Sequence, residues 1–189
     1  MRRGILGGTF DPPHLAHLVA ADAARSQAAL DVVTFLPAGA PWQKAGVDVS
    51  DPAHRWEMTR LAVAGLAGFE ADDREVRRAG WSYTVDTLES FPVDEDLVLI
   101  LGADAAAGIG SWHRPEAVLA RAAVVVMPRP GVDRGAVEAA VGSPMFLDTP
   151  ELAISGTMLR ERRRRGLGIR FLVPDAVLAY IEANRLYAA

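Results

Sequence analysis

Two histidines follow a glycine pair near the start of the chain and are the clearest candidates for chemistry. Residues 7–17 read GGTFDPPHLAH, with Gly7 and Gly8 ahead of His14 and His17. Two imidazoles three positions apart suit either a metal or an anion. Zinc would need a third ligand, and the chain offers only two other histidines and no cysteine. An anion is therefore favoured over zinc, and the alternative that both histidines only cap and solvate a helix end stays open.

The residues around the histidines predict a strand, a tight turn and a helix start. Residues 3–8 form a short apolar run that ends in glycine, as expected for a strand. Asp11 is a suitable N-cap, and Pro12 would occupy the first helical position, where proline is well tolerated. His14 and His17 would then lie on one face of the first turns. Backbone amides, the helix dipole and two imidazoles would converge on one point, which favours a phosphate group.

Composition limits the class of protein. The chain has 189 residues, half of them hydrophobic, and a formal net charge of −4. We expect a single domain over 1–189, without nucleic acid as a partner, because a dedicated nucleic-acid binder is usually basic. No apolar run approaches the roughly 18 residues of a membrane helix, and no cysteine ties the fold to an oxidising compartment. We therefore expect a cytoplasmic protein with no membrane contact, and the assembly of several copies stays open.

Short apolar runs alternate with helical patterns along the chain. Strands are predicted at 3–8, 31–37, 96–102, 122–128 and 145–149, with a weaker one at 69–76. Helices are predicted at 13–29, 52–66, 84–91, 115–121, 133–141, 155–165 and 174–186. Continuous apolar strands are typical of parallel sheets that are covered on both faces. The pattern therefore predicts an α/β protein with a Rossmann-like, doubly wound and mostly parallel sheet, whose ligands bind beyond the carboxyl ends of the strands.

Five segments, in this order, resemble one enzyme family. GGTFDPPHLAH resembles the phosphate-binding segment of the nucleotidyltransferase superfamily, whose signature is a glycine turn followed by H-x-G-H. LPAGAPWQK, GWSYTVDTL, LGADAAAGIGSW and AISGTMLR then appear as in bacterial nicotinate-nucleotide adenylyltransferases. The resemblance covers nearly the whole chain. It implies transfer of AMP from ATP to nicotinate mononucleotide, with deamido-NAD and pyrophosphate as products and Mg²⁺ accompanying the ATP.

The resemblance also implies roles for individual residues. His17 would contact the α-phosphate, His14 the phosphates beside it, and Lys44 and Arg160 would complete the catalytic set. The residues that would contact ATP are Gly8, Thr9, Phe10, Gly102, Asp104, Ile154, Ser155 and Thr157. Asp104 could instead cap the next helix, or bind the nucleotide ribose or magnesium through water. Ser155 is also a plausible N-cap for the helix predicted after it. The acceptor would lie between Thr84, Trp112, which would stack on its ring, and Trp42 as a lid.

The chain departs from the family pattern at two positions. Ala16 stands where the signature has glycine, and Gly156 replaces a hydroxyl residue in the late motif. Both changes are small, so they affect individual contacts rather than the type of reaction. The arginine-rich run 160–165 cannot place all its charges on one helix face, and we expect a solvated helix with one useful arginine, Arg160.

Other functions remain as alternatives. The same transfer could act on phosphopantetheine or nicotinamide mononucleotide, and a non-catalytic nucleotide sensor could use the same fold. A dehydrogenase function is disfavoured, because the chain has no G-x-G-x-x-G dinucleotide-binding motif after the first strand. A phosphate nucleophile is already ionised at neutral pH, so the absence of a catalytic triad or carboxylate pair is no objection to the transfer.

Overall fold

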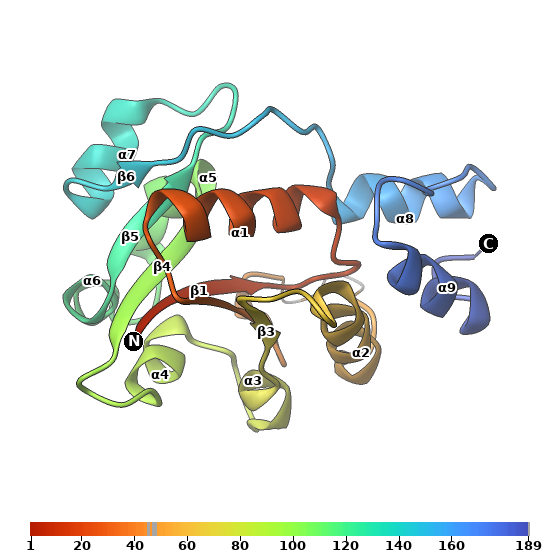
Figure 1. Cartoon of the computed structure of the whole chain (residues 1–189), viewed down its shortest axis with the longest axis horizontal. Helices are drawn as coiled ribbons and strands as arrows, with labels where there is room; N and C mark the ends of the chain where they lie inside the picture. The colour runs from red at the N-terminus through yellow and green to blue at the C-terminus, as the bar shows by residue number, and fades with distance from the viewer. Residues whose placement is uncertain (45, 47–48, 189) are drawn as a thin grey trace.

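A parallel sheet forms the centre of the structure (Figure 1). The computed structural model describes residues 1–44, 46 and 49–188. Within them the strands are β1 (Arg2–Gly8), β2 (Val32–Pro37), β3 (Phe69–Ala71), β4 (Asp96–Gly102), β5 (Ala123–Met127) and β6 (Met145–Phe146). They lie in the order β3-β2-β1-β4-β5-β6, and every neighbouring pair is parallel. This is the strand order of a Rossmann fold, so the predicted fold class is confirmed.

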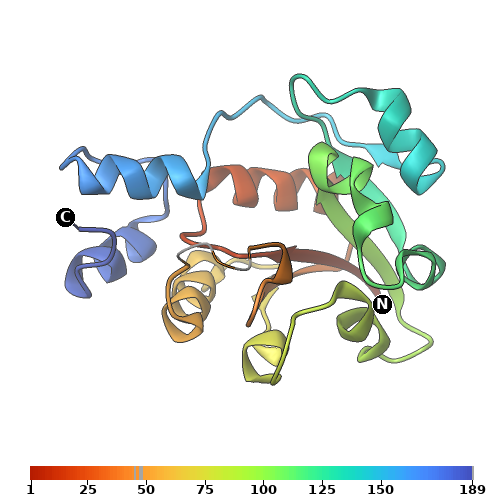
Figure 2. The ribbon, with the colours of Figure 1, turned by 180° about the vertical axis from the view of Figure 1, so that it is seen from behind.

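Helices connect the strands and cover both faces of the sheet. They are α1 (Leu15–Gln27), α2 (Pro52–Val63), α3 (Arg74–Arg77), α4 (Thr84–Glu89), α5 (Ala103–Ala107), α6 (Pro115–Arg121), α7 (Arg134–Val141), α8 (Gly156–Arg164) and α9 (Asp175–Ala183), with short 3₁₀ helices η1 (Trp42–Lys44) and η2 (Ile109–Ser111). Figures 1 and 2 show α1 on one side of the sheet, and α3 and α4 on the other. Within the described residues, no helix is both long and apolar enough to cross a membrane.

The strands separate the core into two apolar layers. In β4, Val98 and Ile100 pack in the layer with α1, α2, α8 and α9, whereas Leu97 and Leu99 pack in the layer with α4 to α7. All four side chains are at most 2% exposed. Because successive side chains of a strand point to opposite faces, a strand that is buried on both sides reads as one continuous apolar run. This is why β4 could be predicted from its sequence.

The strand order reverses direction between β1 and β4. From β1 the chain proceeds to β2 and β3 on one side of the sheet, and then returns to β4, β5 and β6 on the other. The crossover helices diverge at this point and leave a crevice beyond the carboxyl ends of the two strands, which is where such folds bind ligands. Gly8 ends β1 and Gly102 ends β4, so both predicted contact residues lie at this crevice.

Two predicted strands differ from the observed ones. The candidate at 69–76 is a strand only over Phe69–Ala71, because Asp72 turns the chain by accepting the Arg74 amide through Oδ1 at 2.8 Å, and α3 follows. The strand at 145–149 is reduced to Met145–Phe146 at the sheet edge. The sequence reasoning also missed the five-residue helix α5, which directly follows β4.

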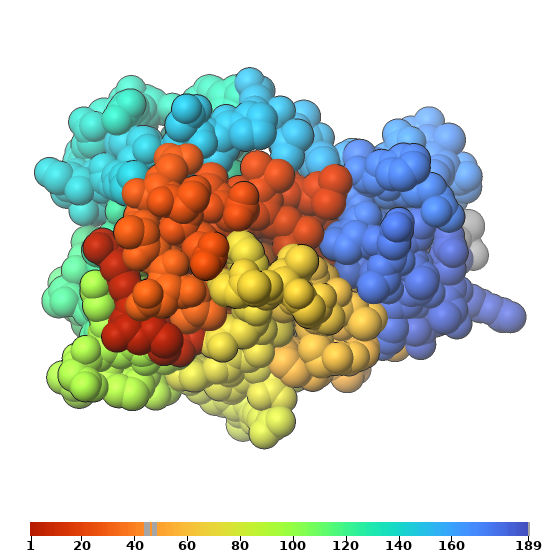
Figure 3. Space-filling view, in the orientation of Figure 1, coloured from red at the N-terminus to blue at the C-terminus, as the bar shows by residue number. Residues whose placement is uncertain are grey.

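The two C-terminal helices pack at one end of the molecule. Helix α9 contacts α2, and in the space-filling view the C-terminal segment (blue) lies against that part of the chain (Figure 3). His54 of α2 and Tyr180 of α9 join the two helices through a hydrogen bond between Nδ1 and the phenol oxygen at 2.8 Å. Leu159 of α8 and Ile181 of α9 are fully buried in the α1 layer of the core. This packing carries the start of α8 to the edge of the crevice.

Candidate active site

A large cavity opens at the point where the strand order reverses. Its volume is about 1070 Å³. Sites for single small ligands usually measure about 300–1,000 Å³, so this cavity has room for two bound molecules. Most of the predicted site residues line it, namely Gly8, Thr9, His14, His17, Trp42, Thr84, Gly102, Asp104, Trp112, Ile154 and Ser155. Segments that are far apart in the sequence thus line one cavity.

The two histidines form one wall of the cavity at the start of α1. Their rings stack with centroids 3.7 Å apart, and the His14 amide donates to His17 Nδ1 at 3.1 Å. Phe10 meets the His17 ring edge-on at 4.9 Å and is itself buried. Among the described residues Phe10 is not one that lines the cavity, so its contact with ATP stays a prediction while its side chain supports His17.

His14 is buried and uncharged at neutral pH. Only 5% of the residue is exposed, and its Nδ1 atom has no hydrogen-bond partner within the described part of the chain. Burial, together with the positive charge of Arg129, lowers the pKa of His14 to about 4. The imidazole therefore meets a ligand as a neutral group with one N–H donor, rather than as a cation.

The predicted cap of this helix is wrong. Helix α1 begins at Leu15 with His14 as its N-cap, not at Pro12 with Asp11 as the cap. The Leu15 amide donates instead to the carbonyl of Leu172 at 3.0 Å. The Asp11 carboxylate is buried and accepts hydrogen bonds from residues that are distant in the sequence. Oδ1 accepts from the Tyr187 hydroxyl at 2.6 Å, and Oδ2 accepts from the Ser50 amide at 3.1 Å. Tertiary contacts thus replace the local cap.

The start of α8 forms a second wall beside the histidines. Ser155 is the N-cap as predicted, since its hydroxyl accepts from the Met158 amide at 3.2 Å, and both Ser155 and Ile154 line the cavity. Thr157 is exposed and is not among the described residues that line it. Arg160 Nη1 donates to the Asp11 carbonyl oxygen at 2.7 Å. The predicted contacts of Thr157 and Arg160 with phosphates stay predictions.

Gly156 packs directly against the histidine loop. A Cβ atom at this position would lie 2.7 Å from the Asp11 carbonyl oxygen and 3.3 Å from Arg160 Nη1. The backbones of the loop and of α8 therefore approach so closely that a side chain would force them apart. This contact gives a physical reason for the glycine that replaces the hydroxyl residue of the family pattern.

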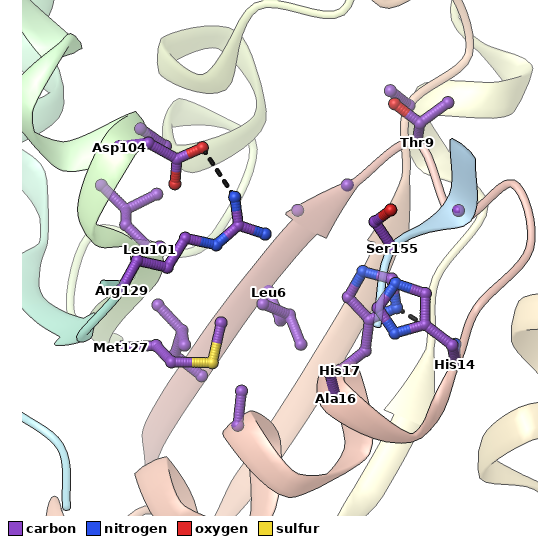
Figure 4. Close-up of a pocket in the computed structure, with 18 of the residues that line it drawn as sticks. Leu6, Thr9, His14, Ala16, His17, Leu101, Asp104, Met127, Arg129 and Ser155 are labelled. Carbon is purple, nitrogen blue, oxygen red and sulfur yellow. Dashed lines mark hydrogen bonds and ion pairs between the residues drawn. The ribbon is translucent and has the colours of Figure 1, made fainter. Parts of the chain in front are cut away.

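The opposite side of the cavity carries an ion pair at the ends of β4 and β5. Arg129 Nη1 lies 3.1 Å from Asp104 Oδ2, and Figure 4 shows the two side chains across the cavity from His14 and His17. Asp104 lies in the first turn of α5, whose N-cap is Gly102 with no side-chain cap bond, so the capping role considered for Asp104 is wrong. Both members of the pair are about half exposed and free to reorient on a ligand.

The expected acceptor residues lie at the other end of the cavity. Thr84 begins α4, and Trp112 is half-buried beside η2. Trp42 lies in η1 with its ring 6.3 Å from that of Tyr83. All three expected residues line the cavity. The side chain of Lys44 falls outside the described residues, so its predicted role remains a prediction.

Comparison with known proteins assigns the chain to a family. The model of the cytidylyltransferase-like family matches residues 5–162. The probable nicotinate-nucleotide adenylyltransferase of Desulfitobacterium hafniense (strain Y51) is 44% identical and covers 98% of this chain and 95% of its own length, and that of Salinibacter ruber is 42% identical and covers 99% and 98%. The chain belongs to the nicotinate-nucleotide adenylyltransferase family. The resemblance seen in the sequence is therefore confirmed.

A solved structure shares the fold. Nicotinic acid mononucleotide adenylyltransferase of Plasmodium falciparum, complexed with NaAD, superimposes with a TM-score of 0.82 over 98% of this chain and 97% of its own, at 18% identity. The same protein complexed with APC gives a TM-score of 0.79 at 17% identity. At such low identity the likeness supports the Rossmann-like architecture of this family rather than any single contact.

Two charged residues that line the cavity were not predicted from the sequence. Arg129 lies two residues after the end of β5, and this position beyond a strand end was the signal that could have indicated it. Glu75 also lines the cavity, although only 7% of it is exposed. It lies within the charged run DDREVRR, which resembles a solvated surface, so the sequence offered no signal for it.

Proposed function

We propose that this chain transfers the AMP part of ATP to nicotinate mononucleotide, forming deamido-NAD and pyrophosphate. One observation carries the proposal: the stacked pair His14–His17 lines a cavity large enough for two nucleotides, at the reversal of the strand order. Membership of the nicotinate-nucleotide adenylyltransferase family names the reaction, and the cavity supplies the geometry that the reaction needs.

The transfer requires positioning and charge stabilisation more than proton chemistry. A phosphate oxygen of the acceptor attacks the α-phosphorus of ATP. The new P–O bond forms as the bond to the bridging oxygen breaks, and that electron pair leaves with pyrophosphate. Because the nucleophile is already an anion, no general base is needed, and catalysis comes from holding two anions in line. A helix N-terminus and two imidazoles oppose the negative charge that grows on the α-phosphate.

We assign the nearest contact with the α-phosphate to His17. It is only partly buried, and Phe10 and the His14 amide fix the plane of its ring. His14, which is neutral, contributes an N–H donor to the neighbouring phosphate oxygens. Lys44 and Arg160 complete the proposed set as cations for the β- and γ-phosphates. For Arg160 this requires the guanidinium to share its donors between Asp11 and the nucleotide, since only one of its nitrogens is engaged there.

The remaining cavity residues divide between the two substrates. We assign ATP to the group near the glycine turn and the β4 end, which consists of Gly8, Thr9, Phe10, Gly102, Asp104, Ile154, Ser155 and Thr157. We assign the acceptor to Thr84, Trp112 and Trp42. An indole can stack on the pyridine ring, and backbone amides at the start of α4 can bind the nicotinate carboxylate. A neutral nicotinamide would match such donors less well.

Mg²⁺ is proposed to enter with ATP. In the described part of the chain no group of three or more His, Asp or Glu side chains is arranged to hold a metal ion. Mg²⁺ is commonly held by substrate phosphates with one or two carboxylates, and Asp104 is an exposed carboxylate of the cavity that fits this role. A bound ion would supply positive charge that stabilises the pyrophosphate, and Asp104 would help to hold it in place of its pairing with Arg129.

One assay tests the proposal. Pyrophosphate release from ATP and magnesium is measured with nicotinate mononucleotide, nicotinamide mononucleotide and phosphopantetheine in turn. We expect release chiefly with nicotinate mononucleotide. No release with this acceptor would overturn the proposal, and release only with phosphopantetheine would replace it with that rival. Tight ATP binding without turnover on any acceptor would indicate a nucleotide sensor.

The proposal also includes the place of action and the assembly. We propose that the protein acts in the cytoplasm, where ATP is abundant, and without nucleic acid or membrane partners. Cell fractionation with an antibody tests the location. Light scattering during gel filtration measures whether several copies assemble.

A further inference from the structure

Glu75 is a buried carboxyl group in the wall of the cavity that the transfer does not use. It lies in the short helix α3, only 7% of it is exposed, and it lines the cavity. A carboxyl group is costly to bury unless other groups satisfy it. The groups that contact the Glu75 carboxyl therefore indicate its role.

A hydroxyl group satisfies the Glu75 carboxyl. The Thr87 hydroxyl donates to Oε1 at 2.7 Å, and the Ser82 hydroxyl is near enough to lower the pKa of the carboxyl. Arg78 Nη1 donates in turn to the Thr87 oxygen at 3.3 Å, which directs the Thr87 proton toward Glu75. Ser82 and Thr87 both line the cavity. The carboxyl group thus holds the Thr87 side chain and lies beside Ser82 at the acceptor end of the cavity.

The same network reaches the loop that follows β2. The Ser82 oxygen accepts from the amides of Gly39 at 2.9 Å and Ala40 at 3.3 Å, and the Ser82 amide donates to the Ala40 carbonyl at 3.0 Å. Gly39 lies so close that a Cβ atom there would be 2.1 Å from the Glu75 carbonyl oxygen. Ser82 therefore joins the β2 loop to the start of α4, next to the Glu75 carboxyl.

Thr84 lies between Ser82, which the β2 loop holds, and Thr87, which Glu75 holds. It is the first residue of α4, two positions after Ser82 and three before Thr87. Its backbone can hardly shift while both neighbours are fixed. We propose that Glu75 is a positioning residue for the acceptor, which sets the place of the Thr84 backbone amide in the cavity. This inference rests on the proposed function, because it presupposes an acceptor bound at Thr84.

The environment of Glu75 is compatible with an anionic acceptor. Burial raises the pKa of the Glu75 carboxyl, against the opposing effects of the Thr87 and Ser82 hydrogen bonds and of Arg78 and Arg74. A carboxyl that is more easily protonated repels a neighbouring carboxylate less. Both arginines are partly exposed, and they place positive charge near the Glu75 carboxyl.

The replacement Glu75→Gln tests the inference. Glutamine has the same size, but one of its two polar atoms is a donor, so only the other can accept from the Thr87 hydroxyl as the carboxylate does. We expect KM for nicotinate mononucleotide to rise about three- to tenfold, the range that corresponds to one lost hydrogen bond. KM for ATP should stay within about twofold, because the ATP residues lie on other elements. A general loss of structure would raise both values.

Two further variants make the test decisive. Glu89→Gln removes a carboxylate from the same helix as Thr84, where it pairs with Arg114 on the surface, and should change neither KM. Thr87→Val removes the hydroxyl that donates to Glu75 and should raise KM for nicotinate mononucleotide by a similar factor. The double variant Glu75→Gln/Thr87→Val should show little further rise in this KM. Equal effects on both substrates, or none, in Glu75→Gln and Thr87→Val would overturn the inference. Failure of the wild-type protein to use nicotinate mononucleotide would instead overturn the proposed function, and the inference with it.

Discussion

His14 and His17 form a single unit at the start of α1, because their rings stack at 3.7 Å and the His14 amide donates to His17 Nδ1 at 3.1 Å. The bond fixes which nitrogen of His17 can face a ligand: with Nδ1 accepting, Nε2 carries the ring proton and is the nitrogen that can donate to a phosphate. Phe10 supports the same ring from the side. A donor that is held in this way needs no rearrangement when charge develops on a phosphate.

Removal of the His17 imidazole should therefore impair the chemical step. His17→Ala is expected to lower kcat by roughly 10²–10³, which is the usual cost of losing one fixed donor to the transition state. His17→Asn offers an oxygen that can accept the His14 amide but lacks the imidazole, so a similar loss would show that the effect is not one of helix structure. Steady-state pyrophosphate release at saturating ATP and acceptor measures both.

His54→Ala is the matched control for this prediction. His54 bonds to Tyr180 between α2 and α9 and is not among the described residues that line the cavity. Its kcat should remain near that of the wild type. A wild-type kcat in His17→Ala would show that another group contacts the α-phosphate.

Burial of His14 should make the stability of the protein depend on pH. The pKa of His14 is lowered from 6.5 to about 4 in the folded protein. As pH falls below 6.5, the unfolded chain binds a proton that the folded chain does not, so the free energy of unfolding falls until pH reaches about 4. The loss should reach about 3 kcal/mol from this residue alone.

A His14→Gln variant isolates that contribution. Urea unfolding is measured at pH 7 and pH 4.5 for both proteins, and the wild type should lose about 2 kcal/mol more than the variant over this interval, before other groups common to both are considered. An equal loss in the two proteins would show that His14 titrates near its ordinary pKa.

The sequence predicted those features that depend on neighbouring residues. β4 was recognised in full because both of its faces are buried, and Ser155 was recognised as an N-cap because its partner Met158 is three residues away. The Asp11 cap was wrong because its carboxylate binds Tyr187 and Ser50, which no local pattern relates to it. Features set by contacts between distant segments were the ones that could not be predicted.

The same distinction applies to the site. The histidines, Thr84 and Trp112 stand in motifs and were expected together. Glu75 became visible only when α3 placed it against Ser82 and Thr87. The single domain over 1–189 and the roles of the individual site residues remain predictions.

Gly156 should tolerate no side chain. A Cβ atom would lie 2.7 Å from the Asp11 carbonyl oxygen, which belongs to the backbone and cannot move without its loop. Gly156→Ser is expected to lower the free energy of unfolding by about 1–3 kcal/mol, as overpacking usually does. Because the displaced loop leads to His14, KM for ATP should rise as well. Chemical denaturation and kinetics measure the two effects.

Gly168→Ala serves as the control for that substitution. A Cβ atom at Gly168 meets no atom within 4 Å, so the variant should keep the stability and the ATP KM of the wild type. If Gly156→Ser behaves like Gly168→Ala, the restored hydroxyl is accommodated and the close approach of α8 to the loop is not required.

Tyr187, near the end of the chain, should stabilise the loop that carries His14. Its hydroxyl donates to Asp11 Oδ1 at 2.6 Å, and Asp11 is only 4% exposed. Burial and the charge of Asp11 raise the pKa of the Tyr187 phenol above its ordinary value, so the proton for this bond remains in place over the neutral range. Tyr187→Phe leaves a buried carboxylate with one donor fewer, which should cost about 1–3 kcal/mol of stability.

Tyr180→Phe is the matched comparison. It removes a hydroxyl group that forms a part-buried hydrogen bond with His54, between α9 and α2, and that does not contact Asp11. The two variants should differ in kinetics: Tyr187→Phe should raise KM for ATP, since Asp11 precedes His14 by three residues, whereas Tyr180→Phe should not. Unfolding in urea and initial rates at varied ATP measure both quantities. If Tyr187→Phe kept wild-type stability, the remaining contacts of Asp11 with Ser50 and Arg160 would suffice to hold the loop.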